Sequence, residues 1–133
     1  MTTVMAFGSF DVIHPGHLFY LRHAKALGKE LVVVLATDSS IERIKKIKPK
    51  YTQRERLEHI RALPYVDKAI IGHEGEDPLA IVEEIKPGII ALGYDQRYEI
   101  EDLKEQLKKR GLDVDIFRIG AYKDNIYKSS KLK

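Results

Sequence analysis

The sequence predicts an α/β fold: a Rossmann-like open sheet of five parallel strands with helices on both faces. Short apolar runs alternate with longer helical patterns along the 133-residue chain. Residues 31–36 are apolar at every position, as expected of a central strand covered on both sides. Strands that alternate with helices favour a parallel sheet, because each helix returns the chain to the start of the next strand. No internal repeat or linker interrupts the pattern, so we expect residues 1–133 to form one domain.

The strands are expected at residues 4–7, 31–36, 66–71, 89–92 and 114–119. Gly8 and Gly93 stop the first and the fourth of them. The last strand is amphipathic, which suits the edge of a sheet. Ligands of such sheets bind beyond the carboxyl ends of the strands, where the strand order reverses. The segments that follow the strands are therefore the ones in which to seek a site.

The helices are expected at residues 18–27, 52–63, 77–86 and 99–110. Gly28 and Gly111 follow two of them as C-terminal caps. Thr52 and Glu55 form a capping box at the start of the second helix. Pro78 suits the first turn of the third, where its missing N–H leaves no hydrogen bond unmade.

Composition excludes several classes of site. The chain has no cysteine, which excludes disulfides, thiolate metal sites and a cysteine nucleophile. It also has no signal-peptide pattern and no apolar segment long enough to cross a membrane, so we expect a cytoplasmic protein without a membrane partner. Net charge is only +3, but one stretch is strongly basic and contains no acid: Arg43, Lys45, Lys46, Lys48 and Lys50. This lysine-rich segment could bind polyphosphate or, less readily, nucleic acid, or it could be a solvated loop.

The strongest functional signal is the segment between the first strand and the first helix, GSFDVIHPGH, residues 8–17. Helix N-termini attract anions, and His14 and His17 are spaced so that both rings project to one side of a helical turn. Two imidazole donors at this place suit the charge that develops on a phosphoryl group during in-line displacement. Half of a zinc site, or a helix start with incidental histidines, are the alternatives. Neither a Walker loop nor a dinucleotide-binding glycine motif is present.

This segment resembles the signature of the cytidylyltransferase-like nucleotidyltransferase superfamily, through Gly8-Ser9-Phe10-Asp11 and His14-x-Gly16-His17. The likeness continues at Thr37-Asp38, Gln53-Arg54, residues 65–68 and residues 93–96. The resemblance implies that the nucleotide phosphates are bound by Gly8, Ser9, Phe10, His14, Pro15, Gly16 and His17. It also implies that His14 and His17 stabilise the transition state and that Asp95 holds the ribose or the base, although Asp95 could be a turn residue instead.

Basic side chains complete the site that the resemblance implies. Lys46 and Arg54 are expected to neutralise the triphosphate and the acceptor phosphate as catalytic residues. Within the lysine-rich segment the register is open, so Lys45 or Lys48 could replace Lys46. Arg54 could instead pair on the surface with Glu58, four residues further along the helix.

Within the superfamily, residues 92–96 and 122–130 look most like the archaeal-type FAD synthases. Pro64 stands where the cytidylyltransferase branch carries an arginine. The resemblance implies transfer of AMP from ATP to FMN, a divalent cation such as Mg²⁺, and a homodimer. Tyr122 would contact ATP, and Ser129 and Ser130 could cap a short helix and contact phosphate, or belong to a polar tail.

Two other functions remain open at this stage. The acceptor could be glycerol 3-phosphate, or another polyol or sugar phosphate, with CTP as the nucleotide. More remotely, the chain could be a non-catalytic module that binds nucleotides or RNA through its lysine-rich segment. The chain lacks the interleaved aromatic pattern typical of RNA readers, so we expect small-molecule substrates and no nucleic-acid partner.

Overall fold

The computed structural model describes residues 2–72, 79–93, 96 and 99–120, and it confirms the predicted fold class. A sheet of five parallel strands has the order β3-β2-β1-β4-β5. The strands are β1 (Thr3–Gly8), β2 (Glu30–Leu35), β3 (Lys68–Ile71), β4 (Ile89–Leu92) and β5 (Asp115–Arg118). The helices are α1 (Pro15–Ala26), α2 (Asp38–Lys45), α3 (Gln53–Arg61), α4 (Ala80–Ile85) and α5 (Ile100–Lys109).

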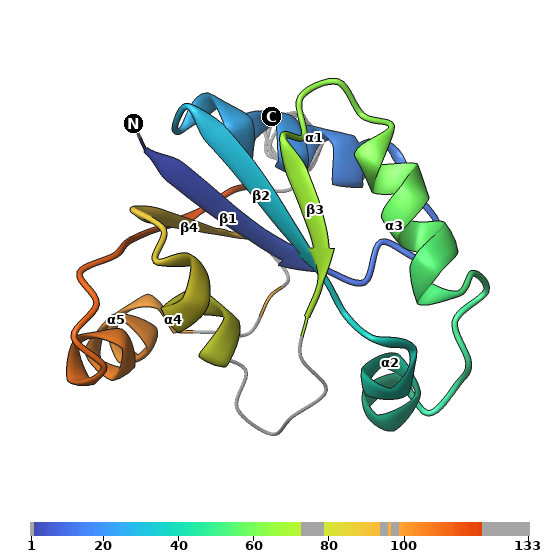
Figure 1. Ribbon diagram of the computed structural model, residues 1–133. Coiled ribbons are helices and arrows are strands. Elements are labelled where there is room, and N and C mark those ends of the chain that lie inside the picture. Colours follow the sequence, from blue (N-terminus) through green and yellow to red (C-terminus); the bar gives the residue numbers. More distant parts are fainter. Residues whose placement is uncertain (1, 73–78, 94–95, 97–98, 121–133) are drawn as a thin grey trace, which may run out of the picture.

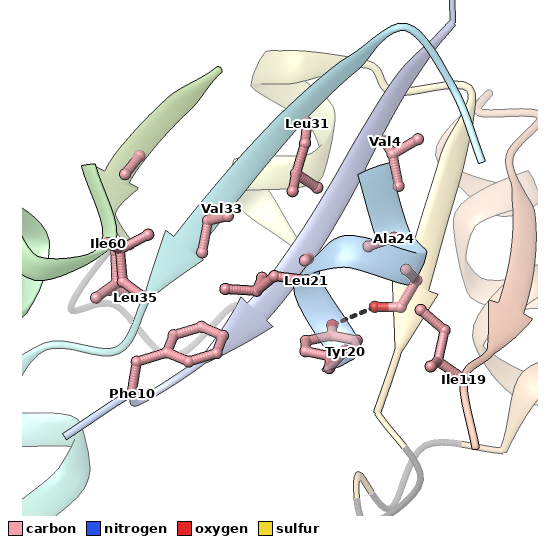
Figure 2. Packing of buried hydrophobic residues seen from close by; sticks show 13 residues of the cluster. Val4, Phe10, Tyr20, Leu21, Ala24, Leu31, Val33, Leu35, Ile60 and Ile119 are labelled. Carbon is pink, nitrogen blue, oxygen red and sulfur yellow. Dashed lines mark hydrogen bonds between the residues drawn. The ribbon is translucent and has the colours of Figure 1, made fainter. Parts of the chain in front are cut away.

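Helices cover both faces of the sheet, α1 and α3 on one and α4 and α5 on the other (Figure 1). The interior strand β2 shows why. Its residues Leu31, Val33 and Leu35 pack into the apolar cluster beneath α1 and α3, which Figure 2 shows from close by. Val32 and Val34, between them in sequence, pack into the opposite cluster with α4 and α5. Successive side chains of a strand point to opposite faces, so an uninterrupted apolar run is what a strand buried on both sides requires.

The helix α2 is not among the helices that the sequence predicts. Thr37 begins this helix, since its hydroxyl accepts a hydrogen bond from the Ser40 N–H at 3.1 Å. Ile41 is its buried apolar residue, whereas Ile44 is 72% exposed. One inward residue in a short helix does not produce an apolar stripe, so periodicity could not reveal it. Figure 1 shows α2 beyond the tip of β2.

Two glycines at the ends of helices have different roles. Gly111 follows α5 with a φ of +79°, as a left-handed cap does. Gly28 does not act in this way, because its φ is not positive. A Cβ on Gly28 would lie 2.8 Å from the carbonyl oxygen of Thr2, so this glycine is required by close packing of the backbone.

Other boundaries differ slightly from the prediction. The Thr52–Glu55 capping box is confirmed at the start of α3. The third strand begins at Lys68 rather than at Val66. The expected start of the third helix, at Asp77 and Pro78, lies outside the described residues. None of the helices described is long and apolar enough to span a lipid bilayer.

Candidate active site

A cavity of about 730 Å³ opens at the carboxyl ends of β1 and β4. In the order β3-β2-β1-β4-β5 the chain builds outward from β1 in both directions, so the crevice between β1 and β4 is the point where strand order reverses. The described residues that line it are Phe7, Gly8, Ser9, Phe10, Asp11, Val12, His14, Pro15, Gly16, His17, Tyr20, Lys45, Gly93, Gln96, Ile119 and Gly120. The structure thus brings the whole predicted segment from Gly8 to His17, apart from Ile13, to one cavity.

At the floor of this cavity, side chains replace the backbone ladder between β1 and β4. The ladder ends at the pair Ala6–Ala91, although β1 continues beyond it. The N–H of Phe7 donates instead to the Tyr20 hydroxyl at 3.2 Å, which in turn donates to the carbonyl of Ala91 at 2.5 Å (dashed line in Figure 2). The Phe7 carbonyl accepts from Nε2 of Gln96 at 2.7 Å. Backbone groups at a buried strand end need such partners, and here they leave the crevice open above them.

Gly8 is required by a neighbouring side chain rather than by a turn. A Cβ at this position would lie 2.7 Å from the ring of Phe10. Phe10 itself is only 2% exposed and has a φ of +48°, a conformation that residues other than glycine rarely adopt. Its ring stacks 6.4 Å from that of Tyr20 and meets the His17 ring edge-on at 5.2 Å. The packing around Phe10 therefore holds the segment that follows β1 in an unusual backbone conformation.

His14 and His17 lie together at the first turn of α1. Their rings stack with centroids 3.8 Å apart. The Nδ1 of His14 accepts from the Gly16 N–H at 3.1 Å, and the Nδ1 of His17 accepts from the His14 N–H at 3.3 Å. The two histidines thus form a capping box, with Pro15 as the first helical residue. A nitrogen that accepts carries no proton, so each neutral ring carries its proton on Nε2. Nε2 is therefore the donor atom of each ring.

Of the lysines considered for the site, Lys45 lines the cavity. Its Nζ lies 3.4 Å from the Ser9 hydroxyl. Lys46 is exposed and caps α2 in a left-handed conformation with φ of +65°, and Lys48 is also exposed. Neither is among the described residues that line the cavity. Of the three lysines, the structure thus brings Lys45 to the cavity.

Arg54 is exposed on the first turn of α3 and is not among the described lining residues either. Its neighbour Arg56, two positions on, is fully buried and was missed by the sequence analysis. The Arg56 guanidinium donates to the Ser9 carbonyl at 2.8 Å, to the Tyr51 carbonyl at 3.2 Å and to the Asp38 carboxylate at 2.8 Å. It thereby ties the segment after β1, the start of α2 and the start of α3 to one another.

Asp11 makes a second tie between the segment after β1 and the residues just before α3. Its carboxylate accepts from the backbone N–H of Lys50 at 2.7 Å and from that of Tyr51 at 2.8 Å. Burial raises the pKa of this carboxyl, but these two hydrogen bonds and the nearby cations Arg56 and Lys45 outweigh burial and hold the pKa below its ordinary value. Asp11 is thus an ionised structural link at neutral pH.

Four predicted contacts lie outside the described residues: Asp95, Tyr122, Ser129 and Ser130. The zinc alternative finds no support in the part of the chain that is described, because no group of three or more metal-ligating side chains occurs there. Both Nδ1 atoms of the histidine pair also accept backbone hydrogen bonds.

Comparison with known proteins identifies the family. The model of the cytidylyltransferase-like family matches residues 5–133, which include the segment from Gly8 to His17. The chain belongs to this family.

Relatives within the cytidylyltransferase-like family are similar over most of their length. An FAD synthase of Methanosarcina barkeri is 47% identical over 124 residues, covering 93% of this chain and 87% of the relative. An FAD synthase of Thermoplasma volcanium is 45% identical over 133 residues, covering 100% of this chain and 92% of the relative.

Solved structures show the same architecture. The crystal structure of the lipopolysaccharide core biosynthesis protein from Thermoplasma volcanium has a TM-score of 0.87 at 46% identity, and the match covers 92% of this chain and 98% of that one. Pantoate-beta-alanine ligase from Francisella tularensis has a TM-score of 0.62 at 11% identity, over 90% of this chain and 59% of the ligase. At such low identity the second likeness shows the fold alone.

Proposed function

We propose that this chain is an FMN adenylyltransferase, an FAD synthase that transfers AMP from ATP to FMN and releases pyrophosphate. The observation that carries the proposal is the stacked pair His14 and His17, which begins α1 at the mouth of the cavity. The acceptor follows from the relatives, which are named FAD synthase at 44–49% identity.

The reaction needs positioning and charge stabilisation more than proton transfer. An oxygen of the FMN phosphate attacks the α-phosphorus of ATP, and the bond from that phosphorus to the pyrophosphate breaks. The attacking phosphate is already an anion at neutral pH, so a general base is not required. Nε2–H donors from His14 and His17, together with the N-terminus of α1, suit the negative charge that builds on the transferring group. Lys45 would neutralise a neighbouring phosphate.

ATP would enter as its magnesium complex. Mg²⁺ in such sites is held by substrate phosphates with only one or two carboxylates, and it keeps several waters. The described residues offer no cluster of carboxylates, and Asp11 is engaged with two backbone N–H groups. We therefore treat the metal as part of the substrate. A homodimer acting in the cytoplasm belongs to this proposal as well.

The central test separates the chemistry of His14 from its role as a helix cap. Asparagine is a good N-cap, and its Oδ1 can accept from the Gly16 N–H in place of Nδ1. We expect His14→Asn to fold like the wild type and to lose about 10²-fold in turnover, because the Nε2–H donor is absent. His17→Ala should lose about as much. Circular dichroism verifies the fold, and chromatography of FAD measures turnover. Near-normal turnover in both folded variants would contradict the proposed role.

A second assay tests the acceptor. Pyrophosphate release is compared between ATP with FMN, and CTP with glycerol 3-phosphate or a sugar phosphate. The sugar-phosphate arm is included because one similar structure is that of a lipopolysaccharide core biosynthesis protein. We expect release only with ATP and FMN. Pyrophosphate release only in the assays with CTP would refute FMN adenylylation, but the chain would still be a nucleotidyltransferase.

A further inference from the structure

Exposed apolar side chains gather on the side of the cavity that α2 borders. Among the residues that the structure describes, the large apolar side chains that are exposed are Val12, Ile44, Ile47 and Phe117. Phe117 lies apart from the others, on the edge strand β5. One exposed apolar side chain is ordinary on a protein surface, but a group of them beside a cavity is typical of an interaction site. We call Val12, Ile44 and Ile47 the apolar rim.

Ile44 is exposed although it lies on the inward side of α2. Residues three and four positions apart are neighbours on one face of a helix, so Ile44 and Lys45 both lie one turn beyond the buried Ile41. Figure 1 shows α2 beyond the tip of β2, and the rest of the protein covers Ile41 but not Ile44. Lys45, on the same turn, lines the cavity. Ile44 therefore presents apolar surface beside a lysine of the site.

Ile47 and Val12 are held near the same place by contacts on either side of them. The segment that contains Ile47 is tied at both ends to the chain after β1. At one end Lys45 contacts Ser9, and at the other the N–H of Lys50 donates to a carboxylate oxygen of residue 11 at 2.7 Å. Val12 directly follows that carboxylate in the chain and lines the cavity together with Lys45. The apolar rim therefore lies along the border between the cavity and the lysine-rich segment.

Cations surround the rim. The two isoleucines alternate with basic residues, and no acid occurs between residues 43 and 50: the basic residues are Arg43, Lys45, Lys46, Lys48 and Lys50. A ligand that suits this surface combines an anionic group with an apolar part. FMN has both, because a ribityl chain joins its phosphate to a flat isoalloxazine ring. Glycerol 3-phosphate and sugar phosphates have no apolar part, so the complementarity of the rim favours a flavin acceptor.

We propose that the apolar rim binds the isoalloxazine ring of FMN while the FMN phosphate reaches the histidine pair. The identity of the acceptor rests on the proposed function. Val12 and Lys45 line the same cavity as His14 and His17, so a ring attached to a phosphate in the cavity can lie over the rim. The ring takes no part in bond breaking, and contacts with it are equally strong in the ground state and in the transition state. The rim should therefore lower KM for FMN without changing kcat or KM for ATP.

The test compares Ile44→Ser, Ile47→Ser and the double variant with the wild type. Both sites are exposed, and serine has about the same helix propensity as isoleucine, so each variant should fold. FMN binding is measured by fluorescence polarisation with an ATP analogue present whose methylene bridge between the first two phosphates prevents transfer of AMP. We expect FMN to bind about fivefold more weakly to each single variant and about 25-fold more weakly to the double variant. KM for FMN should rise by the same factors, with kcat and KM for ATP changed less than about twofold.

Two controls separate apolar contact from other effects. Ile44→Leu and Ile47→Leu keep the apolar volume and should bind FMN nearly as well as the wild type. Phe117→Ser removes the exposed apolar side chain that is not among the described lining residues, and it should leave FMN binding within twofold. Ions do not screen an apolar contact, so the loss in the serine variants should be the same at low and at high salt.

The outcomes distinguish this inference from the proposed function. If the double variant bound FMN within twofold of the wild type, or if it bound the ATP analogue as weakly as it bound FMN, the rim would not be a flavin site. FAD formation by the wild type would then leave the proposed function standing. A wild type that binds no FMN and releases pyrophosphate only with CTP would refute the proposed function, and this inference with it.

Discussion

Replacing Arg56 with methionine tests whether a buried guanidinium holds the active-site segments together. Methionine can fill much of the same space but leaves the Ser9 carbonyl, the Tyr51 carbonyl and the Asp38 carboxylate without their donor. An acceptor left without a partner costs about 1–3 kcal/mol when it is buried. The Asp38 side chain is 35% exposed, so water can replace its lost partner in part. We therefore expect the free energy of unfolding to fall by about 3 kcal/mol, at the lower end of the cost of breaking a buried ion pair.

The assay is urea unfolding followed by circular dichroism at neutral pH, with the kinetics of FAD formation alongside. Arg54→Met is the matched control, since it makes the same change two positions earlier on the same helix at an exposed site. It should change the free energy of unfolding by less than about 0.5 kcal/mol. A drop in kcat/KM for Arg54→Met at unchanged stability would support the catalytic role that the resemblance implies. If Arg56→Met lowered the free energy of unfolding by less than about 1 kcal/mol, the structural reasoning would be refuted, because buried acceptors without a partner cost more than that.

Three further predictions address other contacts of the site. Tyr20→Phe removes a buried hydroxyl that partners the Phe7 N–H, and should lower the free energy of unfolding by about 2 kcal/mol in the same urea assay; an unchanged value would mean that the floor of the crevice does not depend on it. Asp11 has a lowered pKa, so its contribution to stability is present above the ordinary pKa of 3.8 and is lost as the pH falls below that value. The difference in the free energy of unfolding between the wild type and Asp11→Asn should therefore narrow in urea titrations below about pH 4. A difference that stays constant with pH would contradict this. Lys45→Ala should raise KM for ATP about 10-fold and Lys46→Ala should not, whereas the reverse order would restore the register implied by the resemblance.

Most of the fold could be predicted because its determinants are local. The apolar run of β2 indicates a strand buried on both faces, and the Thr52–Glu55 box sets the start of α3. The helix α2 was not predicted, because only the cap Thr37 and the buried residue Ile41 mark it in the sequence. The lysines of the same stretch suggest a loop. Capping residues carry information that apolar periodicity does not, and in short helices they are the better guide.

The site likewise has residues that local sequence patterns predict and residues that they do not. The spacing of His14 and His17 shows in the sequence that they share a helical turn. Arg56 and Gln96 act through backbone partners 47 and 89 residues away, which no local pattern reveals. A partial signal did exist for Arg56, which precedes the buried Ile60 by four positions and so lies on the inward face of α3. An arginine on that face needs several hydrogen-bond acceptors, and acceptors of this kind gather where loops converge at the strand tips.

The capping role of the histidines links the fold to the chemistry. A serine or aspartate would begin α1 as well as His14 does, because its side-chain oxygen would accept from the helix backbone. Such a side chain would not present a ring N–H donor toward the cavity at the same time. Imidazole differs because it has two nitrogens with separate tasks. When Nδ1 accepts from a backbone N–H, the proton of the neutral ring must be on Nε2, so the hydrogen bond that starts the helix also selects the tautomer that can donate to an anion. His17 repeats this arrangement one turn later, and stacking keeps the two rings together. The donors are therefore oriented by backbone geometry before any nucleotide arrives, which is the condition under which fixed dipoles stabilise a transition state without reorganising.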